Sequence, residues 1–180
     1  MKILYFNDWR LGVLKGNDVV DVTGVVQNVP HTNPGNLIIG VIEGWANLRG
    51  NIEKAVASGK GLPVSQVKIR PPLPKPVNVD CMAVNYMENG TLPKPAEINA
   101  FHKSPGCIVG HGDTMIMPDI PLSIFEGEAE LALVMGKRAR NVPQSAFCAL
   151  FPPNVEDPKL AAMARPVFTP PSSKEPLLLS

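Results

Sequence analysis

The sequence lacks the cysteine and apolar patterns that identify several large classes of protein. It contains no CxxC pair, and an odd number of cysteines, Cys81, Cys107 and Cys148, is atypical of a secreted disulfide framework. These features favour a reducing compartment and three small, buried thiols. No secretory signal pattern opens the chain and no apolar run approaches the length of a membrane span. We therefore expect a cytoplasmic location and no membrane partner.

The sequence also lacks a large excess of either charge. Its formal net charge is +1, whereas nucleic-acid surfaces usually show clustered Lys and Arg. The only dense basic cluster is "GKRAR" at residues 136–140, which is typical of a solvated strand end or turn. No nucleic-acid partner is expected.

What is present predicts a small N-terminal domain over residues 1–66. A length of 180 residues suffices for one full domain, or for a small one plus part of another. Apolar runs at 3–6, 11–14 and 19–22 have the length of strands and predict hairpins. Helical spacing follows from Leu37 to Val56, and Gly50 is expected to separate two helical pieces. Trp45 is interpreted as a core anchor.

Proline is abundant, with 20 residues, and unevenly placed. The segment "RPPLPKP" at residues 70–76 has polyproline character. It is interpreted either as a spacer between two modules or as a recognition peptide for an aromatic groove. Short strands are predicted beyond it, within 77–86 and around 107–109, 114–117 and 128–135. The residues 146–180 form a proline-rich, divergent tail with little predicted structure.

The stretch "EGEAELALVMGKRARN" places three carboxylates two residues apart, at Glu126, Glu128 and Glu130. In a helix these side chains would scatter around the cylinder and need no explanation. In a strand they would share one face at roughly 6 to 7 Å, where like charges repel by about 2 to 3 kcal/mol at an effective dielectric of 20. A solvated helix, a solvated strand and a strand that binds a cation all remain open from these residues alone.

Three segments in order resemble the catalytic domain of the fumarylacetoacetate hydrolase family. They are "RPPLPKP" running into a strand that ends in "VNY", then "FHKSPGCIVGHGD" at 101–113, and then "EAELALVMGKRARNV" at 128–142. The resemblance implies an α+β fold, mostly β, in which the small N-terminal hairpin and helix module precedes an incomplete mixed β-roll of the fumarylacetoacetase-like type at residues 67–145.

The resemblance also implies a site. Glu128 and Glu130 fall on the E-x-E metal ligands of the family, and the expected cofactor is a divalent cation, usually Mg²⁺, with Mn²⁺ or Ca²⁺ as alternatives. Glu126 lies just outside that motif. Lys103, in an F-x-K-x-P segment, would bind the carboxylate of a substrate. His102 and His111 match no family histidine and are interpreted as loop residues. The implied activity is metal-dependent hydrolysis, decarboxylation or isomerisation of small 2-oxo or 1,3-dicarbonyl acids.

The sequence departs from the family pattern in two places. No aspartate in an N-D-V-S-x-R-D-like segment follows residue 145, so a third metal carboxylate is missing. The loop "NYMENGTLPKP" has Asn89 and Leu92 where many members have a His and a Glu. These departures predict a truncated catalytic domain with weak or no activity. The alternative is a noncatalytic chain that pairs with a full-length relative or offers its proline-rich segment. The protein partners expected in either case are a second copy of the chain or a full-length relative.

Overall fold

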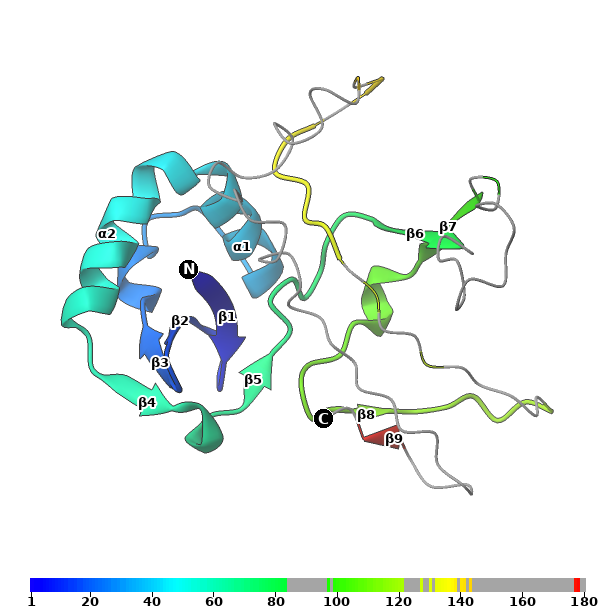
Figure 1. Ribbon diagram of the computed structural model, residues 1–180, viewed down its shortest axis with the longest axis horizontal. Helices are drawn as coiled ribbons and strands as arrows, with labels where there is room; N and C mark the ends of the chain where they lie inside the picture. The colour runs from blue at the N-terminus through cyan, green and yellow to red at the C-terminus, as the bar shows by residue number, and fades with distance from the viewer. Residues whose placement is uncertain are drawn as a thin grey trace.

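The computed structural model describes residues 1–83, 97, 99–121, 127, 130, 132–138, 140, 141 and 143, together with the backbone of 177–178 (Figure 1). Within these residues the protein has a mixed α/β architecture, and every strand pair is antiparallel. No helix in the described part of the chain is long and apolar enough to cross a membrane.

The N-terminal module is a five-stranded sheet with the order β4-β3-β2-β1-β5. Its strands are β1 (Lys2–Phe6), β2 (Arg10–Lys15), β3 (Asp18–Asp21), β4 (Gly61–Pro63) and β5 (Ile69–Arg70). The first three strands confirm the predicted hairpins. The β1–β2 turn contains two non-glycine residues in the left-handed region, Asn7 at φ 47° and Trp9 at φ 61°. Such residues need support from neighbouring groups.

Two helices follow, α1 (Pro34–Glu43) and α2 (Trp45–Ser58). Asn33 caps α1, because its side-chain oxygen accepts a hydrogen bond of 3.0 Å from the backbone N–H of Asn36. The predicted break at Gly50 is wrong, since the helices separate at Gly44. Gly50 is exposed inside α2, where a glycine costs only about 1 kcal/mol relative to alanine. The predicted end of the second helix at "SGKG" is confirmed.

The core lies between the helices and one face of the sheet. Alternation along β1 sends Tyr5 into this cluster, whereas Leu4 and Phe6 join a smaller cluster on the other face. Tyr5 is fully buried, its hydroxyl donates a hydrogen bond of 2.8 Å to the carbonyl of Pro34, and burial raises its pKa to about 12. Trp45 is partly buried against the same cluster, which agrees with its predicted role as an anchor.

The proline-rich segment begins as part of this module. Arg70 lies in β5, opposite Tyr5 of β1. Pro71 is buried, and Leu73 packs against the main core cluster. The start of "RPPLPKP" is therefore bound to the module, which disfavours both the free spacer and the exposed recognition peptide for these residues.

Beyond the module, β6 (Val79–Ala83) and β7 (Asn99–Lys103) form an antiparallel hairpin, to the right of the module in Figure 1. A short strand, β8 (Thr114–Met115), pairs with β9 (Leu177–Leu178). The strands predicted within 77–86 and 114–117 are present in shorter form. The complete β-roll stays a prediction, as do the domain boundaries at residues 66/67 and 145/146. Apart from β9, the predicted tail lies outside the described residues.

Candidate active site

The β6–β7 hairpin orders its side chains on two faces. Cys81 pairs with Phe101, and Val79 pairs with Lys103. Directly opposite residues of an antiparallel pair share a face, so these four side chains lie on one side. Asp80 and His102 lie on the other. Cys81 is buried, whereas Phe101 is 42% exposed. One face of the hairpin therefore combines an apolar base with the ammonium group of Lys103.

The predicted substrate residue Lys103 meets one predicted metal ligand. Its Nζ atom lies 3.9 Å from Oε1 of Glu130 and 5.6 Å from the centroid of the Phe101 ring. The Lys103 and Glu130 side chains are 49% and 37% exposed. A partly exposed ion pair contributes only about 0 to 1 kcal/mol to stability. The significance of this contact is therefore that it brings together two site residues 27 positions apart in the sequence.

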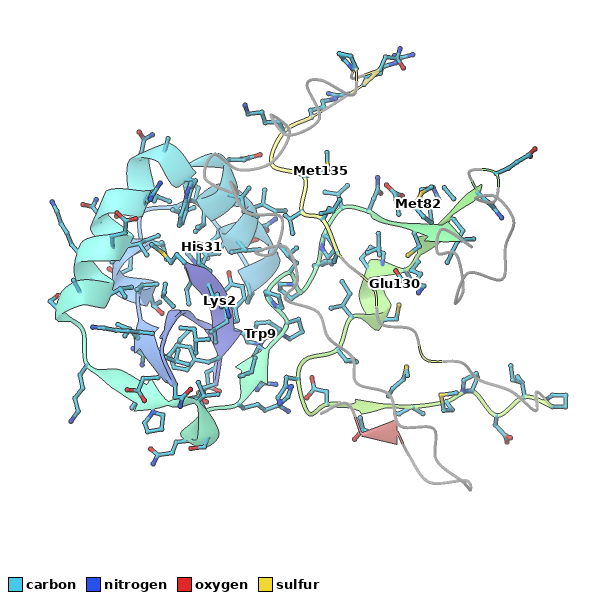
Figure 2. The ribbon with its side chains drawn as sticks, in the orientation of Figure 1. Lys2, Trp9, His31, Met82, Glu130 and Met135 are labelled. Carbon is cyan, nitrogen blue, oxygen red and sulfur yellow. The ribbon has the colours of Figure 1, made fainter. Side chains whose placement is uncertain are left out.

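The acidic stretch is described only in part. Glu126 and Glu128 lie outside the described residues. Glu130 and residues 132–135 are described, and they belong to neither a helix nor a strand (Figure 2). The strand predicted over 128–135 is therefore not found at these positions, because no neighbouring strand within the described part of the chain provides a hydrogen-bonding ladder for them.

The predicted donors have the chemistry that a divalent cation prefers, but only one of the two lies among the described residues. Carboxylate oxygens are hard donors of the kind that Mg²⁺, Mn²⁺ and Ca²⁺ prefer. The described residues contain no group of three His, Cys, Asp or Glu side chains arranged to hold a metal. Glu130 is the one predicted ligand among them, and its partner is currently the Lys103 ammonium. Glu128 as a second ligand stays a prediction from the sequence.

The segment after β7 differs from its prediction. A strand was expected around Cys107, but Pro105–Cys107 forms a short 3₁₀ helix, η4. The Ser104 hydroxyl caps it by accepting a hydrogen bond from the backbone N–H of Gly106, and Pro105 occupies the first turn. The Cys107 thiol, which is exposed and reduced, donates to the carbonyl of Ser104 at 2.8 Å. The cap and proline explain why a turn forms here.

The two histidines have different surroundings. His102 was interpreted as a loop residue, but it lies in β7. Its Nδ1 atom is 2.5 Å from Oδ1 of Asp80, directly across the hairpin. The sequence reasoning missed this pair, because no strand was predicted over residues 99–103. The Asp80–His102 pair lies on the opposite face of the hairpin from Lys103. His111 lies in a turn, as expected.

Comparison with known proteins places these elements in a family context. The profile described as "Fumarylacetoacetate (FAA) hydrolase C-terminal" matches residues 78–151. A fumarylacetoacetate hydrolase domain-containing protein 2 homolog of Dictyostelium discoideum is 28% identical over 139 residues, covering 76% of this chain and 44% of that protein. The mitochondrial oxaloacetate tautomerase FAHD2A of Bos taurus is 30% identical, with coverages of 74% and 42%.

A solved structure shows the same fold. Maleylpyruvate hydrolase from Sphingobium sp. SYK-6, crystallised with a manganese(II) ion and pyruvate, superposes with a TM-score of 0.70 at 28% identity. The alignment covers 84% of this chain and 55% of that one. The chain thus spans about half the length of the relatives it matches. On these motifs, this profile match and this structural likeness, residues 78–151 of the chain belong to the fumarylacetoacetate hydrolase family.

Proposed function

We propose that the chain contributes to a metal-dependent enzyme that acts on small 2-oxo or 1,3-dicarbonyl acids by hydrolysis, decarboxylation or isomerisation. The observation that carries the proposal is the approach of Lys103 to Glu130 on the face of the β6–β7 hairpin that also carries Phe101. Two relatives support the substrate class, since they are named for maleylpyruvate and oxaloacetate. Magnesium, manganese or calcium is the proposed ion, with Glu128 and Glu130 as its protein ligands.

Each described side chain has a role that follows from its chemistry. The Lys103 ammonium would neutralise the carboxylate of the substrate, because it is a compact cation on a side chain that is 49% exposed. Phe101 would pack beside the carbon skeleton of the substrate, since almost half of its surface is exposed. When bound, the cation would polarise a carbonyl oxygen as a Lewis acid. With two protein carboxylates, much of its coordination would come from water.

Calorimetric titration of Mn²⁺ and Mg²⁺ tests the metal assignment. Binding in the millimolar range is expected for the unaltered chain and should be lost in the double variant Glu128→Gln plus Glu130→Gln. Glu97→Gln is the matched control, because Glu97 is an exposed glutamate outside the acidic stretch. Equal binding by the double variant and the control would remove the metal assignment, and with it the proposed enzyme class.

The exposed apolar side chains beyond the module favour a second candidate, a noncatalytic subunit. Val77 and Ile116 are 82% and 90% exposed. A longer family member could cover them in a mixed oligomer. Co-expression with such a relative, followed by size-exclusion chromatography, should then give a complex that Ile116→Glu weakens. Separate elution of the two unaltered chains would reject this candidate.

A further inference from the structure

The turn formed by residues 110–113, "GHGD", binds the edge of the N-terminal module. Each oxygen of the Asp113 carboxylate has a separate partner. Oδ2 accepts a hydrogen bond of 2.8 Å from the backbone N–H of Gly110 and so closes the turn. Oδ1 lies 2.8 Å from Nζ of Lys68, immediately before β5. The Asp113 side chain is only 25% exposed, so this ion pair is partly shielded from water.

The backbone of the turn also approaches β5 closely. A Cβ atom added at Gly110 would lie 3.0 Å from Cδ of Pro71 and 3.1 Å from the carbonyl oxygen of Ile69. One atom belongs to β5 and the other to the start of the proline-rich segment. A side chain at position 110 would therefore crowd the contact, and the turn or residues 69–71 would have to shift slightly. The close approach favours glycine at this position.

Residues 68–70, on the module side of this contact, are held by hydrogen bonds to the β1–β2 turn. The backbone N–H of Asn7 donates to the carbonyl of Lys68 at 2.8 Å, and the backbone N–H of Lys68 donates to the Asn7 side chain at 2.9 Å. Nε of Arg70 donates to the carbonyl of Asn7 at 2.8 Å, and its guanidinium lies 5.7 Å from the ring of Trp9. These contacts support the left-handed backbone at Asn7 and Trp9.

The contact joins residues that precede the family match to residues inside it. The matched residues 78–151 are called the family segment. Lys68, Ile69 and Pro71 precede residue 78, where the match begins, whereas Gly110 and Asp113 lie inside it. Asp113 is also ten positions after Lys103 in the same segment. A contact that holds the 110–113 turn therefore restrains the segment that carries the candidate site.

We infer that the 110–113 turn and residues 68–71 form an interface within the chain, through which the N-terminal module positions the family segment, and that Asp113 closes this interface. The inference concerns the joining of two parts of the chain and does not depend on the metal or on the substrate. Asp113 is a positioning residue in this scheme, since it acts on the site only through the backbone that it anchors.

Two pairs of variants test the interface. Asp113→Asn removes the charge that Lys68 binds, and Asp119→Asn is the control, because Asp119 is an exposed carboxylate nearby. Gly110→Ala adds a Cβ atom to the contact without altering charge. Its control is Gly106→Ala, where the nearest atom beyond the adjoining residues lies 3.4 Å from the added Cβ, an ordinary contact distance.

Two measurements detect opening of the interface: amide hydrogen exchange at residues 66–72 and acrylamide quenching of Trp9 fluorescence. Hydrogen exchange should rise about threefold to tenfold at the backbone amides of 66–72 in both test variants, because Asp113→Asn loses a charged contact and Gly110→Ala crowds residues 69–71. In a Trp45→Phe background, Trp9 is the remaining tryptophan of the two in the chain, and acrylamide should quench it more strongly once Arg70 is released. Circular dichroism verifies that the module stays folded.

Unchanged exchange and unchanged quenching in the test variants would overturn the inference. If exchange at 66–72 and quenching of Trp9 were the same in the test variants as in the two control variants, the turn would not hold the module. Should Gly110→Ala fail to fold, Asp113→Asn and Lys68→Met still decide the question, since Lys68→Met removes the ammonium group but leaves the hydrogen bond between Gly110 and Asp113 in place. Lys68→Met should raise exchange at 66–72 as Asp113→Asn does, and unchanged exchange in Lys68→Met would contradict the proposed pair.

Discussion

The N-terminal module and the family segment differ in how they bury apolar residues. All the buried hydrophobic side chains of the described chain lie in the module except Cys81. In the family segment, Phe101, Ile116 and Leu133 are exposed by 42%, 90% and 45%. Both parts contain strands of similar length. The difference is that the module closes its sheet with two helices, whereas the described part of the segment has a two-stranded hairpin that covers few of its own apolar side chains.

The part of the chain with most of the buried core is therefore not the part that carries the candidate site. A two-layer arrangement, in which helices pack on one face of a sheet, stabilises a domain through burial, whereas an isolated two-stranded hairpin is marginal in water. The candidate site residues Lys103 and Glu130 lie in the less buried part. Their positions should therefore depend on the contact with the module at Asp113 and on any apolar partner that covers the segment.

The largest expected effect is the loss of a core side chain from the module. Ile52 is fully buried, so Ile52→Ala should lower the free energy of unfolding by about 2 to 5 kcal/mol. Phe101→Ala in the hairpin should lower it by less, about 1 kcal/mol, because that residue is already 42% exposed. Urea unfolding followed by circular dichroism measures both. Similar losses would contradict the proposed difference between the two regions.

A second prediction concerns packing density inside the module. A Cβ atom at Gly12 would lie 2.5 Å from Cγ1 of Val19 and 3.0 Å from the ring of Phe6, so Gly12→Ala should cost about 1 to 3 kcal/mol. Gly24→Ala is the control, since nothing lies within 4 Å of its added Cβ. The same unfolding experiment applies. A core that accepts Gly12→Ala as easily as Gly24→Ala would be less tightly packed than the structure indicates.

The junction between the two regions should respond to acid. The hydrogen bond from Lys68, together with that from Gly110, lowers the pKa of Asp113. A carboxyl group with a lowered folded-state pKa stabilises the fold above its unfolded-state pKa of about 3.9, and this contribution disappears as the pH falls through the folded-state value. Quenching of Trp9 in the Trp45→Phe background should therefore increase in that acid range. Asp113→Asn should remove this step and leave quenching high at neutral pH.

The smallest predicted effect lies in the candidate site itself. Lys103 pairs with Glu130, so Lys103→Met should free that carboxylate and strengthen Mn²⁺ binding about twofold to fivefold. Lys137→Met, which removes an exposed ammonium group elsewhere in the segment, should have a smaller effect. Calorimetry measures the two affinities side by side. Weaker Mn²⁺ binding in Lys103→Met would contradict competition between the ammonium and the cation.

Local patterns predicted the module well. Apolar runs of strand length and the helical spacing after Leu37 gave β1 to β3 and both helices, because these elements obtain most of their order from nearby residues. The error at Gly50 shows the limit of this reasoning. A single glycine costs a helix only about 1 kcal/mol, so α2 continues through Gly50, whereas the backbone leaves helical geometry at Gly44, with φ −86° and ψ 6°.

The family segment was predictable in its motifs and less so in its structure. Lys103 and Glu130 were singled out by resemblance, and their approach could not be derived from sequence spacing because it is a tertiary contact. The expected strand at Cys107 became η4, since the Ser104 cap and Pro105 favour a turn over a ladder. The contact of Asp113 with Lys68 was missed altogether, because neither residue lies in a periodic element.

Binding of pyruvate to the Mn²⁺-loaded chain tests the central claim, that Lys103 and the acidic stretch form one site, most directly. Water proton relaxation reports this binding, since an organic acid that reaches the ion displaces some of its water. The account predicts that pyruvate lowers the relaxation enhancement in the unaltered chain and in Lys137→Met, and that Lys103→Met requires a severalfold higher concentration. An identical pyruvate dependence in Lys103→Met would contradict the claim that the ammonium and the ion serve the same substrate.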